Sequence, residues 1–146
     1  MGLGLSKFLN TATHFSVEHF VSLFVPNVIA PFANLFIGLV GTMDVNIGGA
    51  ETTVQTPING NITIKRIRAI AGANARTQNT TINFRDDGVT VASVVIPAGS
   101  VALQDSGALN VAVVGGSLCN LSMDAPAGVG GISNIGVDVE YQAAIA

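Results

Sequence analysis

Short runs of alternating apolar and polar residues, separated by glycine-containing turns, dominate the chain from Thr42 onward. Near the C-terminus Ile135, Val137, Val139 and Tyr141 alternate with glycine or polar residues. A period of two is typical of a half-buried β-strand, because successive side chains of a strand point to opposite faces. No helical periodicity separates these runs. The pattern therefore predicts an all-β fold, an antiparallel β-sandwich or jelly roll, rather than an α/β fold.

The pattern predicts about eight strands. The candidates are Met43 to Ile47, Thr52 to Ile58, Ile62 to Ala71, Thr80 to Arg85, Val89 to Ile96, Leu109 to Val114, Leu118 to Met123 and Ile135 to Gln142. Asp87-Gly88 is the strongest hairpin signal, because the favoured two-residue turn needs positive φ angles, which these residue types tolerate. We therefore expect the two strands that flank Asp87-Gly88 to pair antiparallel.

In the candidate strand Ile62 to Ala71, the apolar residues move from one face of the strand to the other. Its apolar residues shift from even positions, Ile62 and Ile64, to odd positions, Ile67 and Ala69. One extra residue in a strand produces such a shift, so we expect a β-bulge at Lys65-Arg66.

The first 41 residues differ in chemistry from the rest. They hold six of the seven phenylalanines and only two charged residues, Lys7 and Glu18, whereas residues 42 to 146 hold thirteen of the seventeen glycines. We therefore predict an apolar N-terminal arm at 1–41, for assembly or anchoring, and a β-sandwich domain at 42–146. The sandwich is expected to fold without the arm.

The arm is expected to be partly helical. Apolar residues of its first part recur at three- and four-residue steps, which places them on one stripe of a helix. They are Leu5, Phe8, Leu9, Ala12 and Phe15. Ser16 could cap a second helix in which Phe20 and Phe24 lie one turn apart, but Pro26 and Pro31 would kink or end it.

A membrane span is an alternative interpretation of the arm. Residues Phe20 to Val40 include no charged residue, and a helix of that length would extend about 31 Å, close to the thickness of a bilayer core. Against it stand two prolines, two asparagines and the lack of a flanking lysine or arginine cluster. Membrane lipid therefore remains an alternative partner.

Charged residues are scarce. They make up 10% of the chain, compared with about 25% in a typical soluble domain. A surface with so few charges is poorly solvated as a free monomer, so it favours burial against neighbouring subunits and a homo-oligomer. Five of the six basic residues fall between Lys65 and Arg85, which we interpret as a solvated strand face. With a net charge of −3, the chain is not expected to bind a specific nucleic acid.

No catalytic, cofactor or metal site is predicted. The only histidines, His14 and His19, lie in the arm, where we interpret them as partly buried structural residues. The predicted sandwich has no histidine that could act as a base for a serine nucleophile. Cys119 is the only cysteine and is expected to be a small buried hydrophobe. Calcium binding at Asp105 or Asp124 stays open, although no spacing there resembles a calcium loop. We therefore predict a protein that is not an enzyme.

The stretch from residue 59 to 141, somewhat more than half of the chain, resembles a β-sandwich pattern of bacteriophage virion proteins, among them head fibres, capsid decoration proteins and tail appendages. The similar segments are Gly60 to Ile64, Ile67 to Ala69, Thr81 to Phe84 followed by Asp87-Gly88, Val94 to Ser100 and Ile135 to Tyr141. The resemblance implies a virion protein. The arm stands where such appendages often carry a tail-attachment helix or fibre repeats, which favours a position within or upon the shell.

We therefore predict a virion structural protein, a minor capsid, decoration or capsid-associated protein, whose partners are other copies of itself and other virion proteins. Six phenylalanines are the predicted assembly interface: Phe8, Phe15, Phe20, Phe24, Phe32 and Phe36. Two alternatives remain open. One is a host-recognition spike or fibre module, and the other is a membrane-anchored protein of a lipid-containing virus.

Overall fold

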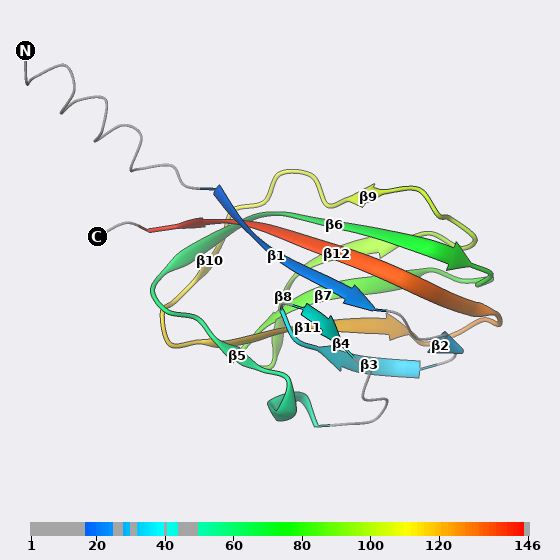
Figure 1. Ribbon diagram of the computed structural model, residues 1–146, viewed down its shortest axis with the longest axis horizontal. Coiled ribbons are helices and arrows are strands. Elements are labelled where there is room, and N and C mark those ends of the chain that lie inside the picture. The colour runs from blue at the N-terminus through cyan, green and yellow to red at the C-terminus, as the bar shows by residue number, and fades with distance from the viewer. Residues whose placement is uncertain (1–16, 25–27, 30–31, 40, 44–49, 145–146) are drawn as a thin grey trace, which may run out of the picture.

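The computed structural model describes residues 17–24, 28–29, 32–39, 41–43 and 50–144, which form two packed β-sheets (Figure 1). The seven strands of the first sheet are β1 (Val17–Phe24), β2 (Val28–Ile29), β4 (Gly41–Met43), β6 (Ile62–Asn74), β9 (Gln104–Asp105), β10 (Val111–Val113) and β12 (Gly131–Ala143). The five strands of the second are β3 (Phe32–Ile37), β5 (Thr56–Pro57), β7 (Thr80–Asp86), β8 (Val89–Ile96) and β11 (Leu118–Ala125). A short 3₁₀ helix, η1 (Glu51–Thr53), precedes β5.

The strand order defines an antiparallel sandwich. It is β10-β6-β12-β1-β4 in the first sheet, where β2 also pairs with β12 and β9 with β6. In the second sheet it is β3-β11-β7-β8, where β5 also pairs with β11. Every described pair is antiparallel except β1 and β4, which run parallel. The predicted all-β sandwich is therefore confirmed.

The hydrophobic core lies between the two sheets. Ile64 and Val137 face it from the first sheet, and Phe84 and Leu121 face it from the second, each at most 1% exposed. The alternation seen in the sequence accounts for this burial, since alternate residues of each strand point into the sandwich.

The predicted hairpin is confirmed. β7 and β8 pair antiparallel, and their last pair, Asp86 with Val89, encloses the two turn residues. Asp87 has a φ angle of 47° and Gly88 one of 81°. Positive φ at both central positions is the geometry of the type I′ turn, whose twist matches that of the flanking strands.

The predicted bulge is confirmed as well. Glu140 of β12 stands opposite Arg66, whereas its neighbour Tyr141 stands opposite Ile64, so Lys65 is the extra residue of β6. Buried positions of β6 accordingly shift from even to odd numbers across this point. The bulge lets both ends of a thirteen-residue strand face the same core.

The N-terminal segment departs from the prediction. β1 pairs with β12 along all eight of its residues, so the expected helix through Phe20 and Phe24 is wrong. β3 pairs with β11, and Leu35 and Ile37 of β3 are buried in the core. The sandwich therefore begins well before the predicted boundary at Gly41-Thr42. The physical reason is that β12 and β11 each expose an edge that an apolar segment can complete, and this pairing outweighs the weak local preference for a helix.

Two further expectations concern the same segment. The helix expected from Leu5 to Phe15, and its capping residue Ser16, lie outside the described residues. Most described residues of the predicted membrane span lie in strands β1, β2 and β3. Across the described ranges, no helix is long and apolar enough to cross a bilayer.

Candidate functional site on the outer face of the first sheet

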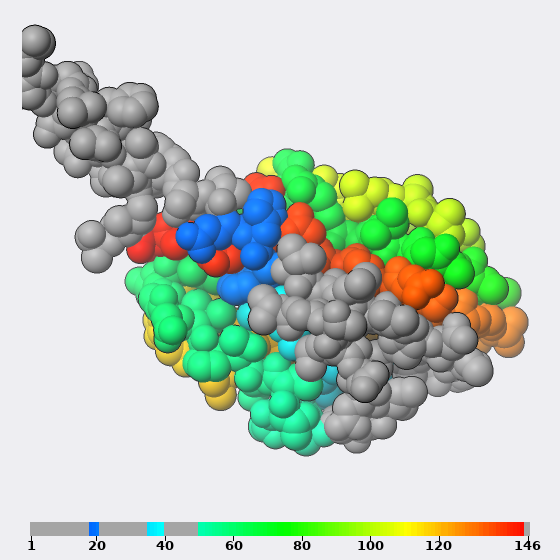
Figure 2. Space-filling view, viewed as in Figure 1, coloured from blue at the N-terminus to red at the C-terminus, as the bar shows by residue number. Residues whose placement is uncertain are grey.

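A network of ion pairs lies on the outer face of the first sheet, where β6, β12 and β1 are neighbouring strands. Figure 2 shows the red and orange residues of β12 beside green residues of β6 at the surface. The strand register places Arg68 of β6 opposite both Asp138 of β12 and Asp105 of β9. Arg68 Nη1 lies 3.2 Å from Asp138 Oδ2, and its Nη2 lies 3.1 Å from Glu140 Oε2. Arg68 Nε is 3.5 Å from Asp105 Oδ2. One guanidinium thus joins three carboxylates from two neighbouring strands.

The network extends to two more strand positions. Arg66 Nη1 lies 3.3 Å from Asp105 Oδ2, and His19 Nδ1 of β1 lies 2.7 Å from Asp138 Oδ1. The side chains of the network are between 22% and 40% exposed. Ion pairs open to solvent in this way contribute at most about 1 kcal/mol each to stability. Their main effect is to concentrate polar groups on one face.

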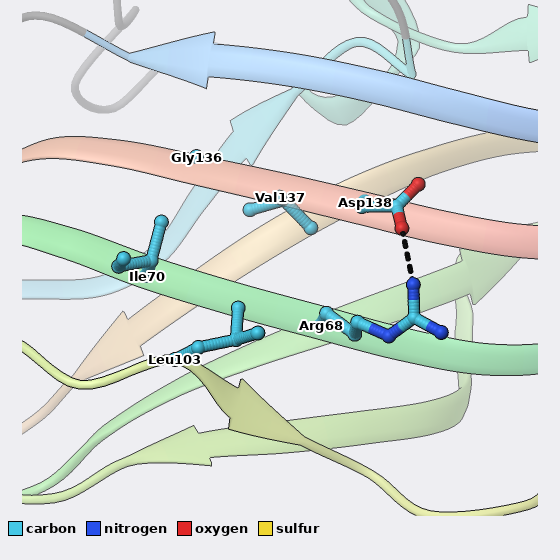
Figure 3. Close-up of a pocket in the computed structure, with 6 residues that line it drawn as sticks. All are labelled: Arg68, Ile70, Leu103, Gly136, Val137 and Asp138. Carbon is cyan, nitrogen blue, oxygen red and sulfur yellow. Dashed lines mark hydrogen bonds and ion pairs between the residues drawn. The ribbon is translucent and has the colours of Figure 1, made fainter.

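A pocket of about 350 Å³ adjoins this network (Figure 3). Gly136 of β12 stands opposite Ile70 of β6, and a methyl group at position 136 would lie 3.4 Å from Ile70 Cγ2. A side chain at position 136 would therefore take up part of the space beside Ile70. Leu103, which precedes β9, supplies a second apolar wall, and Arg68 with Asp138 lines the polar end. Such a site suits a small group with one apolar and one polar end.

Two residues elsewhere have strongly raised pKa values. Burial raises the pKa of the Cys119 thiol to about 12, with smaller contributions from the charges of Asp86 and Asp87. Burial also raises the pKa of Tyr141 to about 12, helped by the hydrogen bond that its hydroxyl donates to Glu18 Oε2 at 2.6 Å. Cys119 is fully buried, as predicted. Its thiol stays protonated at neutral pH and is a poor nucleophile.

Of the six predicted interface phenylalanines, the structure describes the side chains of two, Phe20 and Phe36, and these two lie on different sheets. The ring of Phe20 stacks on that of Tyr141 with centroids 4.3 Å apart. Phe36 lies on the other sheet, with Arg85 Cζ 5.4 Å from its ring centroid. Phe24 belongs to β1 and Phe32 to β3, and their side chains are outside the described set. Phe8 and Phe15 lie outside the described residues, so the assembly role of the six stays a prediction.

The histidine and aspartate candidates have specific partners. His19 is exposed and belongs to the ion-pair network, so the expected partial burial is wrong for it. His14 lies outside the described residues. Asp105 belongs to the network, and Asp124 accepts a hydrogen bond from Asn83 Nδ2 at 2.8 Å. No group of three or more histidine, cysteine, aspartate or glutamate side chains in the described residues could hold a metal ion.

The basic residues between positions 65 and 85 do not share one surface. Arg66 and Arg68 lie on the outer face of the first sheet, as expected for a solvated strand face. Arg85 lies on the second sheet and pairs with Glu51, with Nε and Oε1 2.5 Å apart. Arg76 is only 2% exposed, donates a hydrogen bond to the carbonyl of Ala127, and has a pKa lowered by burial.

Sequence reasoning identified neither the pocket nor the network. Arg68 and Asp138 are seventy residues apart in the chain, and only the pairing of β6 with β12 brings them together. A glycine between two apolar strand residues was visible at position 136. That pattern often marks a close approach or a gap in a sheet, but it does not say which residue stands opposite.

Comparisons with known proteins identify no family. No protein-family model matches the chain, and no curated protein matches it either. Among solved structures, the globular domain of the zebrafish complement 1qA protein matches 88% of this chain and 97% of its own, with a TM-score of 0.46 and 10% sequence identity. A likeness this weak carries no conclusion about function.

Proposed function

We propose that this chain is a virion structural protein, a minor capsid, decoration or capsid-associated subunit. The observation that carries the proposal is the number of large apolar side chains exposed on a chain with few charges. They are Ile70, Val89, Val95, Val101, Leu103, Val114, Leu118 and Val129. Scattered apolar residues are ordinary on a protein surface, but exposed apolar area with little charge around it favours association with other subunits.

The distribution of charge adds support. The ion-pair network gathers five charged side chains on the outer face of the first sheet: Arg66, Arg68, Asp105, Asp138 and Glu140. From Val89 to Gln104, by contrast, sixteen consecutive residues carry no charge. A subunit whose surface has both a charged patch and an uncharged stretch is suited to a shell, in which some surfaces meet solvent and others meet neighbours. The resemblance to bacteriophage virion proteins is the reason for proposing a phage particle as the assembly.

The phenylalanine interface belongs to the same proposal. Phe20 and Phe36 make contacts within the chain, so replacing them would affect the fold as well as assembly. Phe8 and Phe15 precede every described strand and offer the cleaner test. Truncating an aromatic anchor in a buried interface typically costs about 2 kcal/mol or more of binding free energy.

The test is incorporation into particles. Particles are purified by sedimentation from cells that express a tagged chain, and copy number is measured by quantitative mass spectrometry. We expect the wild-type chain at a fixed copy number per particle, and strongly reduced incorporation of a Phe8→Ser, Phe15→Ser variant with unchanged melting temperature. Absence of the wild-type chain from particles would refute the proposal. Normal incorporation of the variant would remove those two phenylalanines from the interface.

The pocket favours a second candidate, a host-recognition module. A site of about 350 Å³ with apolar and charged walls could hold part of a host surface molecule. Gly136→Ala narrows the pocket by one methyl group, whereas Val129→Ala changes an exposed position elsewhere. If the chain is a recognition module, Gly136→Ala weakens binding of particles to host cells without lowering copy number. Equal binding by both variants would eliminate this candidate.

A further inference from the structure

The strand β8 forms an edge of the second sheet. It pairs with β7 on one side, and no strand of the described chain pairs with its other side. Apart from the ladder with β7, no backbone group of Val89–Ile96 takes part in a hydrogen bond elsewhere in the described residues. With eight residues, β8 is the longest edge strand of the described sheets. An open edge of this length is a template for another strand.

The usual protections of an open edge are scarce in β8. Proteins commonly place lysine, another charge or proline on such strands, and β8 has none of these. A bulge interrupts its register near the start, where Phe84 pairs with Ala92 and Arg85 with Thr90. The bulge displaces Val91 alone and leaves the regular stretch from Ala92 to Ile96 available for pairing.

The side chains of this stretch divide between two faces. Ala92, Val94 and Ile96 are buried in the core, whereas Ser93 and Val95 are exposed on the outer face. A strand added at this edge would therefore meet small or β-branched side chains on the outer face. Residues of that kind pack well across neighbouring strands.

We propose that β8 pairs antiparallel with β8 of a second copy of this chain, so that the second sheets of two subunits join across a two-fold axis. This inference rests on the proposed structural role, and it identifies the surface through which two subunits associate. An antiparallel pairing of identical strands is self-complementary, as a two-fold interface requires. This pairing gives hydrogen-bond partners to the backbone N–H and C=O groups on the unpaired side of β8 in both copies.

Charge favours a second copy as the partner. Each chain has a net charge of −3, so two copies repel wherever their charged faces meet. The uncharged run from Val89 to Gln104 allows two copies to meet without like charges facing each other. Arg85, which stands opposite Thr90 of β8, is already paired with Glu51.

The test uses opposite charges at Val95, which is 42% exposed. In an antiparallel pair whose two-fold axis passes through the middle of Ala92 to Ile96, the two copies of Val95 are diagonal neighbours on the outer face, within reach of long charged side chains. The full-length chain and its Val95→Lys and Val95→Glu variants are compared by sedimentation velocity. We expect a dimer for the wild type, monomers for each variant alone, and a dimer when the two variants are mixed. The control Val129→Lys places the same charge at an exposed position in the loop between β11 and β12 and should stay dimeric.

Amide hydrogen exchange gives an independent readout on the wild-type chain. Amides of Ala92 to Ile96 should become more protected as the concentration rises through the dimerisation range, whereas those of Val111–Val113, on another edge, should not. A monomeric wild type, a dimer unaffected by Val95→Lys, or equal protection at all concentrations would overturn the inference.

Failure of this inference is separable from failure of the proposed function. If Val95→Lys enters particles at the wild-type copy number and the wild type is monomeric, the β8 interface is wrong and the structural role stands. If the β8 dimer forms in solution but the chain is absent from particles, the dimer stands and the virion role is wrong.

Discussion

Two regions of the sandwich reach their strands by different routes. The hairpin of β7 and β8 joins neighbours in the chain through the two-residue turn Asp87-Gly88. β1 instead pairs with β12, so that Glu18 and Tyr141, which are 123 residues apart, stand side by side. The turn residues specify the pairing of the hairpin, whereas β1 can pair only with a sheet edge that other strands have formed. Local signals therefore predict the first region well and the second poorly.

Removing the N-terminal strands is the strongest way to test this comparison. A chain that begins at Thr42 lacks β1 and β3 and exposes one edge in each sheet. We expect it to lose its cooperative thermal transition, because the lost core exceeds the roughly 5–15 kcal/mol by which a domain is stable. Circular dichroism during heating measures this. As a control, a chain beginning at Val17 keeps every described strand and should melt cooperatively. A stable fold of the chain that begins at Thr42 would support the domain boundary predicted at Gly41-Thr42.

Core truncations sharpen the comparison residue by residue. Ile37 of β3 and Ile82 of β7 are at most 1% exposed, one in a distant strand and one in the local hairpin. Replacing either with alanine should lower the free energy of unfolding by about 2–5 kcal/mol, since both leave a cavity. Urea denaturation gives the values, with Val129→Ala as an exposed control expected within about 0.5 kcal/mol of the wild type. A much smaller loss of unfolding free energy for Ile37→Ala than for Ile82→Ala would mean that β3 contributes little to core packing.

The turn of the hairpin is the next test. Gly88→Val should lower the free energy of unfolding by about 1–3 kcal/mol, because a β-branched residue resists the φ angle of 81° found there. The added Cβ would meet Glu51 Oε2 at an ordinary 3.6 Å, so backbone strain and not a clash is the cause. Gly88→Asn should cost less, since asparagine tolerates positive φ. Equal losses for the two variants would argue against strain.

The smallest effect is expected at the ion-pair network. Arg68→Met removes contacts to three carboxylates but keeps much of the side-chain volume. Because the partners are partly exposed, we expect a loss of at most about 1 kcal/mol. Added salt should reduce the difference between variant and wild type further. A loss of several kcal/mol that persists in high salt would show that the network is structurally essential.

Much of the fold followed from the sequence. Alternation predicted β6, β7, β8, β11 and β12, and the shift in its phase located the bulge at Lys65. The candidate pocket did not follow, because Ile70, Leu103 and Gly136 come from three separate segments of the chain. The stacking of Phe20 on Tyr141 was equally hidden, since an isolated phenylalanine-rich run fits a helix as well as a strand.

By itself, the sequence determined the features that arise between chain neighbours: the period of two, the Asp87-Gly88 turn, the bulge and the burial of Cys119. These depend on local backbone geometry and on the apolar character of single residues. Only the tertiary structure decided that Val17–Phe24 and Phe32–Ile37 are strands, that Arg68 meets Asp138, and that β8 is left at an edge. Pairing between distant segments depends on which sheet edges remain open after the rest of the chain has folded, and no local pattern records that outcome.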